Sequence, residues 1–269
     1  MPDSWRVIIH GASPGCVNMA IDEAILICHA KGFSPPTLRF YGWAPPALSL
    51  GYAQVASKVV DFKSCASLGV DLVRRPTGGR AVLHEDEVTY SVVVASALVP
   101  GTVEQTYLKF STALTSALRA LGVPATIAPR ARGLALRHSS SLCFEAASSY
   151  EILVNGKKLV GSAQTRRYGC ILQHGSIVMS MDYSKLEAVV KDGGAGLRNR
   201  ATSIEEAIGR RLRREELIGQ LIVAFKEAVC GEVHEGDLEP EERCLAHELR
   251  LKYADVEWGR LKENTRRMP

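Results

Sequence analysis

Aromatic residues are scarce in this chain, at 6 % of 269 residues, and no two of its seven cysteines form a CxxC pair. No apolar run approaches the roughly 20 residues that a membrane-spanning helix needs. The first 15 residues lack the basic region and the long apolar region of a signal peptide. We therefore expect a cytoplasmic protein with free thiols, no membrane association, no disulfide framework and no metal site.

The charge of the chain is unevenly distributed. Residues 201–269 carry 12 basic and 15 acidic side chains, whereas residues 1–200 carry 21 basic and 14 acidic ones, a net +7. A basic body suits an acidic protein partner, although ordinary solubilising charge explains it as well. We expect no nucleic-acid binding, because aromatics are few and the basic run Arg210–Arg214 is followed at once by Glu215 and Glu216.

The pattern of apolar residues predicts strands mixed with helices through residue 200, and a helical pattern from about 203 onward. Short hairpin-like connections favour an α+β fold, a mixed β-sheet with flanking helices, over a doubly wound parallel sheet. We expect a catalytic domain over residues 1–200 (core about 32–205) and a C-terminal helical segment, 201–269, packed on the same core. The expected elements are a helix over 18–31 with Asn18 as N-cap, strands over 37–43, 48–50, 70–75, 82–83, 88–95 and 170–179, a helix over 103–121, and a hairpin around Asn155-Gly156.

The stretch RRPTGGRAVLH, residues 74–84, is the first candidate site. Two glycines after a strand allow the backbone to approach a ligand closely, and exposed amides in such a turn bind anions. Arg74 and Arg75 are suited to neutralise an acidic group. A simple glycine turn with solvated arginines is the alternative, and spacing alone favours it. His84 and, further on, His174 each adjoin a strand, where a lone histidine is more often structural.

Cys143 is the second candidate, because it follows three serines at an expected junction between a loop and a strand. Reactive thiols need partial exposure and a nearby positive charge, and an inert half-buried thiol is the alternative. Lys158 is the third. In a two-residue hairpin Val154 pairs with Lys157 and Leu153 with Lys158, so the two lysines point to opposite faces. A lysine near a thiol lowers its pKa, but the hairpin alone does not bring Lys158 to Cys143.

Five segments in this order resemble the biotin/lipoate protein ligase superfamily, and most closely its cysteine-dependent octanoyltransferase branch (LipM-type). They are NMAIDEA, TLRFYGWAPPALSLGYAQ, RRPTGGRAVLHEDEVTYSV, CFEAASSYEILVNGKKLVGSAQTRR and LQHGSIVM. The resemblance covers most of residues 15–205. It implies a transferase that takes octanoyl from acyl carrier protein and passes it to a lysine of a lipoyl domain, typically that of the glycine cleavage H protein, without ATP, a metal or another cofactor.

The resemblance also implies roles for individual residues. Cys143 matches the nucleophile that carries octanoyl as a thioester, and Lys158 matches the lysine that lowers its pKa. The positions that match or adjoin the substrate pocket are Arg74, Arg75, Thr77, Gly78, Gly79, Arg80, His84, Gly161, Ser162, Ala163, His174 and Gly175.

Other functions remain open. An ATP-dependent lipoate–protein ligase resembles this chain, but has a third glycine where Arg80 stands and does not need a thiol before the lysine hairpin. A lipoyl amidotransferase also uses a cysteine and a lysine. A non-catalytic lipoate- or biotin-sensing protein is disfavoured because both Cys143 and Lys158 are present.

Overall fold

The computed structural model describes residues 4–129, 150–191 and 196–255. Strands and helices alternate irregularly along the chain. In chain order they are β1 (Trp5–Ser13), α1 (Gly15–Ala30), β2 (Thr37–Trp43), β3 (Ala47–Leu50), α2 (Ala56–Val59), α3 (Phe62–Ser67), β4 (Asp71–Arg74), β5 (Val82–His84), β6 (Glu87–Ala95), α4 (Val103–Ala120), β7 (Ala125–Ile127), β8 (Ile152–Val154), β9 (Lys157–Arg167), β10 (Cys170–Val178), α5 (Tyr183–Val189), the 3₁₀ turn Leu197–Asn199, α6 (Ile204–Ile208), α7 (Arg214–Phe225) with a π-helical extension Lys226–Cys230, β11 (Val233–Glu235) and α8 (Pro240–Ala254).

A mixed sheet runs through the middle of the molecule in the order β11-β1-β2-β6-β10-β9-β8-β7. The strands from β2 to β7 pair antiparallel, whereas β1 pairs parallel with both β2 and β11. The long strands at the centre, β6 and β10, are rich in Val, Ile and Leu because both of their faces are covered.

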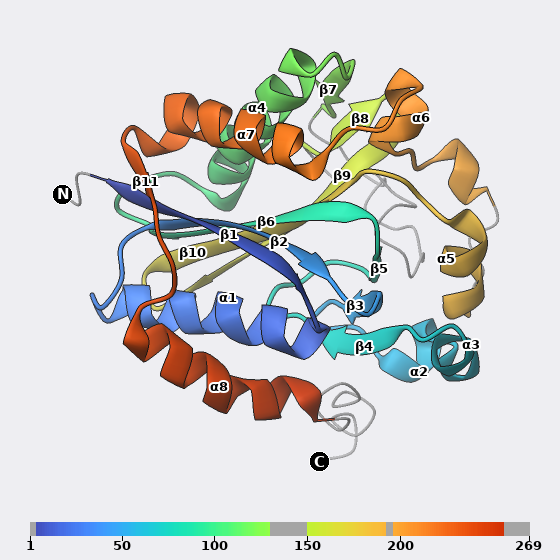
Figure 1. The fold of residues 1–269 in the computed structure, drawn as a ribbon, viewed down its shortest axis with the longest axis horizontal. Coiled ribbons are helices and arrows are strands. Elements are labelled where there is room, and N and C mark those ends of the chain that lie inside the picture. The colour runs from blue at the N-terminus through green and yellow to red at the C-terminus, as the bar shows by residue number, and fades with distance from the viewer. Residues whose placement is uncertain (1–3, 130–149, 192–195, 256–269) are drawn as a thin grey trace.

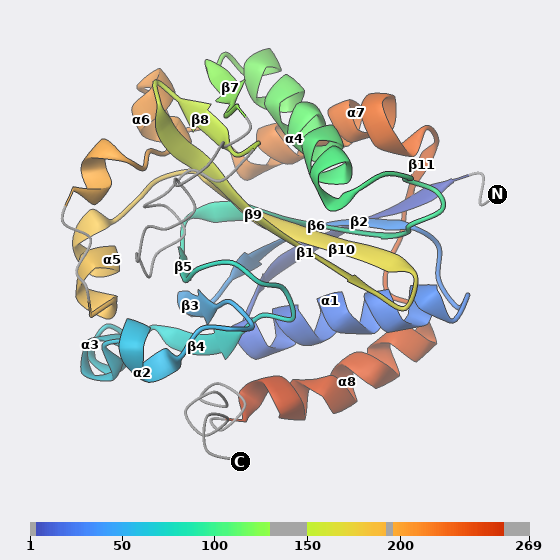
Figure 2. The ribbon, with the colours of Figure 1, turned by 180° about the vertical axis from the view of Figure 1, so that it is seen from behind.

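Helices cover the sheet on both sides. In Figure 1, α4 and α7 lie on one face of the sheet, and α1 lies on the other. α8 packs on the side of α1 that faces away from the sheet (Figure 1). The first face packs the larger apolar cluster, which includes Tyr90, Phe110 and Phe225. The second face packs Ile8 of β1 and Leu172 of β10 against Ile25 of α1. The same two layers are seen from behind in Figure 2.

A second, three-stranded sheet, β4-β3-β5, lies beside the large one. Together with α2, α3 and α5 it encloses a separate apolar cluster that includes Leu48, Val59 and Leu186. This sheet holds the RRPTGG turn, which connects β4 to β5. The small sheet lies on the α1 side of the large sheet (Figure 1, Figure 2).

The C-terminal residues contribute to both layers. α7 packs against α4, α8 packs against α1, and β11 extends the large sheet beyond β1. Two buried charges join α8 to β1: Arg6 donates to both carboxylate oxygens of Glu242, at 2.8 and 2.6 Å. Within the described part of the chain, no helix has the length and apolar character that crossing a bilayer requires.

The α+β fold with a mixed sheet and flanking helices is confirmed, and so is the hairpin, in which Asn155 and Gly156 have φ of +50° and +77°. Two expectations were wrong. Asn18 is not an N-cap, because α1 begins at Gly15 and the Asn18 amide donates to the carbonyls of Ser13 and Gly42. The C-terminal segment is not continuously helical, because β11 interrupts it.

Candidate active site

A pocket of about 370 Å³, its open mouth included, lies between the large sheet, α1 and the β4–β5 turn. The buried end is formed mainly by α1, β2, β6 and β10, and the mouth is formed by the turn and β9. Its lining residues are Met19, Tyr41, Trp43, Arg75, Gly79, Val82, His84, Thr89, Gly161, Ser162, Ala163, His174, Gly175 and Ser176.

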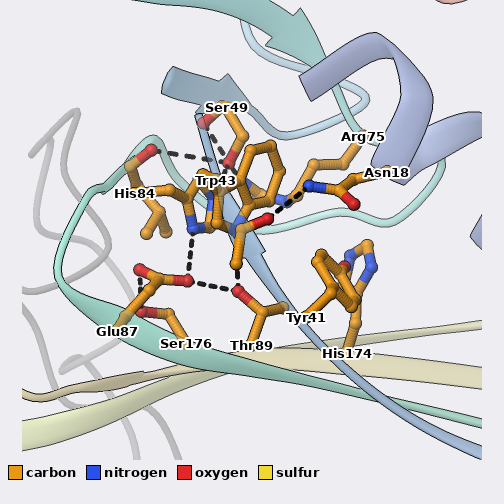
Figure 3. Close-up of polar contacts among 12 residues, drawn as sticks. Asn18, Tyr41, Trp43, Ser49, Arg75, His84, Glu87, Thr89, His174 and Ser176 are labelled. Atoms are coloured by element: carbon orange, nitrogen blue, oxygen red, sulfur yellow. Dashed lines mark hydrogen bonds and ion pairs between the residues drawn. The ribbon is translucent and has the colours of Figure 1, made fainter. Parts of the chain in front are cut away.

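One wall of the pocket is the indole of Trp43, which stacks on the His84 ring at 3.9 Å between centroids (Figure 3). The indole Nε1 donates to Thr89 Oγ1 at 2.7 Å, and Thr89 in turn donates to Glu87. Glu87 also accepts from His84 Nδ1, at 2.8 Å, and from Ser176. The polar groups of this wall thus bond to one another, so the wall presents the faces of the Trp43 and His84 rings to the pocket.

His84 connects this wall to the RRPTGG turn through Ser49. The Ser49 hydroxyl lies 2.7 Å from His84 Nε2 and accepts from Arg75 Nη1, also at 2.7 Å. The same hydroxyl also donates to the carbonyl of Val82, at 3.5 Å. The other Arg75 nitrogen, Nη2, donates to the carbonyls of Gly78 and Arg80 and fixes the shape of the turn.

Two glycines from different loops meet at the mouth. A Cβ on Gly51 would lie only 1.9 Å from the carbonyl oxygen of Gly79, so no other residue fits at position 51 without moving the turn. Gly79 itself has a φ of +88°, which side chains disfavour. Tyr52 then donates its backbone N–H to the carbonyl of Thr77 at 2.9 Å. The turn is therefore held by the loop after β3.

A second buried network lies under the pocket, on the α1 side. Asp22 Oδ2 accepts from His174 Nδ1 at 3.0 Å and from the Tyr41 hydroxyl at 2.9 Å, while Oδ1 accepts from Arg39 at 2.7 Å. His174 Nε2 then accepts from Thr77 Oγ1 at 2.7 Å. This chain of bonds connects α1, β10 and the turn.

Burial and neighbouring charges shift the pKa values of these groups in opposite directions. Burial alone would raise the pKa of Asp22, but the hydrogen bond from His174 and the charge of Arg39 outweigh it and lower the pKa. Burial lowers the pKa of His174 despite Asp22. Glu87 resembles Asp22: burial raises its pKa, and the charge and hydrogen bonds of its partners, His84 first, lower it overall. At neutral pH Asp22 and Glu87 are ionised and His174 is uncharged.

An irregularity in the hairpin determines which residues of β9 share a face with Lys158. Leu153 pairs with Lys158, but Ile152 pairs with Val160, so Leu159 is an extra residue in β9. Such a bulge places two successive residues on one side of the strand. Leu159 and Val160 both pack in the large core, and Lys158 consequently shares the opposite face with Gly161 and Ala163 of the pocket.

The Lys158 side chain is 2 % exposed, and its ammonium group forms an ion pair with Glu151, which is 3 % exposed. Its backbone joins the segment after the 3₁₀ turn: the N–H donates to the carbonyl of Arg200, and the carbonyl accepts from Thr202. Lys157, by contrast, is partly exposed beside Tyr183 and Arg198. The two lysines thus point to opposite faces, as the hairpin pattern predicted.

The structure brings most of the predicted site residues together. Those that line the pocket are Arg75, Gly79, His84, Gly161, Ser162, Ala163, His174 and Gly175. Thr77, Gly78 and Arg80 belong to the turn that borders it. Arg74 points elsewhere: its guanidinium donates to the carbonyls of Gly51, Tyr52 and Gln54 and supports the loop after β3. Cys143 lies outside the described residues, so its distance from Lys158 stays a prediction.

Sequence reasoning missed several residues that shape this site. They are Asp22, Arg39, Tyr41, Trp43, Ser49, Gly51, Thr89, Glu151 and Ser176. Two of them left a signal. Asp22 lies three residues after Met19 on the apolar side of a helix, where a charge demands a partner. Glu151 precedes Leu153 by two residues and therefore shares the face of Lys158. Within residues 4–129, 150–191 and 196–255, no group of three or more His, Cys, Asp or Glu side chains is arranged to hold a metal ion.

The sequence of this chain matches a known family over most of its length. Residues 14–226 match the model of the lipoyl protein ligase A/B catalytic domain, and the chain belongs to that family. It is 44 % identical over 266 residues to the octanoyltransferase LipM of Moorella thermoacetica, covering 95 % of this chain and 97 % of that protein. It is 38 % identical over 272 residues to the octanoyltransferase LipM of Bacillus subtilis, with coverage of 96 % and 98 %.

The solved structures similar to this chain include lipoate ligases. A lipoate-protein ligase A bound with ATP superimposes with a TM-score of 0.82 at 28 % identity, over 96 % of this chain and 98 % of that one. A putative lipoate protein ligase from T. acidophilum with bound lipoic acid gives 0.80 at 27 % identity, with the same coverage.

Proposed function

We propose that this chain is an octanoyltransferase of protein lipoylation that works through a thioester on Cys143. It takes octanoyl from the phosphopantetheine arm of an acyl carrier protein and passes it to a lysine of a lipoyl-domain protein such as the glycine cleavage H protein. The observation that carries the proposal is similarity to octanoyltransferases over nearly the full length of both chains, at 37–44 % identity. The reaction takes place in the cytoplasm without ATP or a metal ion.

The reaction has two balanced steps. In the first, the Cys143 thiolate attacks the thioester carbonyl, the bond to the carrier sulfur breaks, and the carrier thiolate takes up the proton that Cys143 gave up. In the second, an acceptor lysine amine attacks the Cys143 thioester, an amide forms, and the cysteine sulfur leaves and is reprotonated. A thioester exchange followed by amide formation needs no nucleotide, because the amide is the more stable product.

Lys158 is the group that favours the Cys143 thiolate in this proposal. Its ammonium is buried, so its charge acts on a neighbouring thiol with little screening by water. Glu151 fixes the position of that ammonium. Because of the bulge at Leu159, Lys158 shares a face of β9 with Gly161 and Ala163, which supports a thioester placed over these residues. Backbone amides near Gly161–Ala163 are candidates for binding the oxyanion, a contribution of about 3–4 kcal/mol in other enzymes.

The pocket suits an uncharged acyl chain. Although Glu87, Asp22 and Arg75 lie around it, each is held by protein groups: Glu87 by His84, Thr89 and Ser176, Asp22 by His174, Arg39 and Tyr41, and Arg75 by Ser49 and the turn. Its lining therefore offers the rings of Trp43 and His84 and apolar side chains. Each methylene of the chain that leaves water contributes about 0.8 kcal/mol.

An ATP-dependent ligase is the second candidate, supported by the similarity to a lipoate-protein ligase A with bound ATP. The two functions predict different requirements. The purified protein and an apo lipoyl-domain acceptor are mixed either with octanoyl-acyl carrier protein alone or with free octanoate, ATP and Mg²⁺, and the acceptor mass is recorded. We expect the octanoyl mass increase in the first mixture. An increase only in the second mixture would make the chain a ligase.

A further inference from the structure

Arg167, the last residue of β9, lies on the pocket face of that strand. Side chains alternate along a strand, so positions 163, 165 and 167 share one face. The ladder to β10 agrees: His174, which lines the pocket, is opposite Ala163, and Cys170, which packs under α1, is opposite Arg167. The β9–β10 turn lies next to α1 in both views of the fold (Figure 1, Figure 2). Arg167 therefore lies on the same strand face as the pocket mouth.

Two contacts hold Arg167 at this position. Its guanidinium carbon is 5.5 Å from the centre of the Tyr52 ring, and Nη1 is 4.0 Å from Glu23 on α1. Tyr52 is 40 % exposed and directly follows Gly51, the glycine that packs on the turn. The arginine thus spans the gap between β9 and the loop that supports the mouth, and one third of its side chain faces solvent.

These contacts neutralise the positive charge of Arg167 only weakly. Glu23 already accepts two hydrogen bonds from Lys252, at 2.6 and 2.9 Å, and one from the Tyr253 hydroxyl at 2.7 Å. The Arg167 contact, at 4.0 Å, is much longer, and a partly exposed ion pair of that length contributes little. The guanidinium is therefore able to bind an anion at the surface, and phosphate is the anion whose geometry it matches best.

The distance from the mouth fits a carrier arm. Arg167 lies four positions after Ala163, which is about 13 Å along an extended strand. Between its phosphate and its sulfur, a phosphopantetheine arm has about twelve backbone bonds, as many as four amino-acid residues, and spans about 13–14 Å when extended. An arm laid along β9 with its thioester at the mouth would thus place its phosphate beside Arg167.

We propose that Arg167, supported by Tyr52, binds the phosphate of the phosphopantetheine arm that delivers the acyl group, an assignment that rests on the proposed octanoyltransferase function. The site recognises the arm itself rather than the protein that carries it. A donor without the phosphate gains nothing from Arg167.

The test compares three donors: octanoyl-acyl carrier protein, octanoyl-phosphopantetheine and octanoyl-pantetheine, which lacks the phosphate. For each, kcat/KM is measured with wild type, Arg167→Gln, Arg167→Lys and Arg166→Gln. Arg166 is the matched control, because it is the neighbouring arginine on the opposite face, where it donates to Gly101 and Thr106. We expect Arg167→Gln to lower kcat/KM about tenfold for the two phosphate-bearing donors and to leave octanoyl-pantetheine unchanged. Arg167→Lys should retain part of the effect, and Arg166→Gln should change none of the three.

A loss confined to the carrier protein, or an equal loss for all three donors, would overturn the proposal. Binding of phosphopantetheine and pantetheine without an acyl group, measured by calorimetry, separates its failure from that of the proposed function. If wild type uses none of the donors, the octanoyltransferase proposal fails, and the calorimetry decides on Arg167 by itself. Tighter binding of the phosphate-bearing arm to wild type than to Arg167→Gln would support the site, and equal binding would refute it.

Discussion

Lys158 and Glu151 form an ion pair whose two side chains are almost completely buried. Lys158 belongs to β9 and Glu151 directly precedes β8, and they share a face because Lys158 pairs with Leu153, two residues after Glu151. Burying two charges is costly, so a pair of this kind is weak evidence for stability and better evidence for a positioned charge. Its location on the pocket face connects it with the chemistry proposed for Cys143.

Removing the carboxylate of this pair alone should lower the stability of the protein more than removing both partners. Glu151→Gln is expected to lower the free energy of unfolding by about 3 kcal/mol, because the buried ammonium loses its charge partner. The double variant Glu151→Gln/Lys158→Met should regain part of that loss, although it will be inactive. Urea denaturation of the three proteins measures both effects. A double variant less stable than Glu151→Gln would show that the ion pair does not govern stability here.

The two glycines of the RRPTGG turn should respond differently to the same substitution. Gly79 has a φ of +88°, and an added Cβ would lie 3.3 Å from the Arg75 guanidinium, so Gly79→Ala should cost roughly 1–2 kcal/mol. A Cβ on Gly78 meets nothing within 4 Å, so Gly78→Ala should change stability by less than about 0.5 kcal/mol. Thermal unfolding and donor kcat/KM, measured on both variants, check this. Equal effects of the two substitutions would mean that the positive φ of Gly79 is not what the pocket requires.

The stability of the protein should fall as the pH drops from about 7 to 5. Burial lowers the pKa of His174 in the folded protein, so between that value and the ordinary 6.5 the unfolded chain binds more protons, and protonation favours unfolding. Each such group contributes a slope of up to about 1.4 kcal/mol per pH unit. Asp22, whose pKa is lowered, loses its contribution only below about pH 4.

Urea denaturation across that pH range is the measurement. His174→Gln should flatten the slope, whatever its effect on stability at a single pH. His10 also has a lowered pKa, caused mainly by burial, and His10→Gln serves as the control, which should remove only its own share. An unchanged slope in His174→Gln would contradict the assignment of a neutral, buried His174.

Residues 201–269, as we propose, fold as part of the same unit as the rest of the chain. Glu242→Ala leaves the buried Arg6 without its carboxylate and should cost about 3–5 kcal/mol. Glu239→Ala is the matched control, because Glu239 is 43 % exposed and 3.7 Å from the same arginine, and it should cost less than about 1 kcal/mol. Fluorescence and circular dichroism should give one coincident transition. Separate transitions would indicate an independently folding C-terminal segment.

The hairpin shows what a sequence pattern predicts well. Asn155 and Gly156 define a tight turn locally, and the turn fixes the pairing of Leu153 with Lys158. The bulge at Leu159, the next residue, was not predictable, because it depends on how Leu159 and Val160 pack in a core assembled from distant segments. Local chemistry thus located Lys158 and set its face, while tertiary packing determined that Gly161 and Ala163 share that face.

The pocket likewise combines residues that local motifs predict with residues that only tertiary packing brings together. Its glycines and histidines lie in motifs that the sequence displays, and these were predicted. Trp43 and Asp22 were missed, because strand and helix patterns do not tell which polar groups the fold brings together. β11 was missed for a similar reason: three residues pair with β1 across more than 220 positions of chain. Such a short strand exists only because its partner is already in place.

The most direct test of the central claim is the intact mass of the protein after incubation with octanoyl-acyl carrier protein in the absence of ATP. The account predicts an octanoyl adduct on wild type that hydroxylamine removes, no adduct on Cys143→Ser, and a much slower appearance of the adduct on Lys158→Met. An adduct that persists in Cys143→Ser, or no adduct on a wild-type protein that still octanoylates an acceptor, would contradict the thioester route.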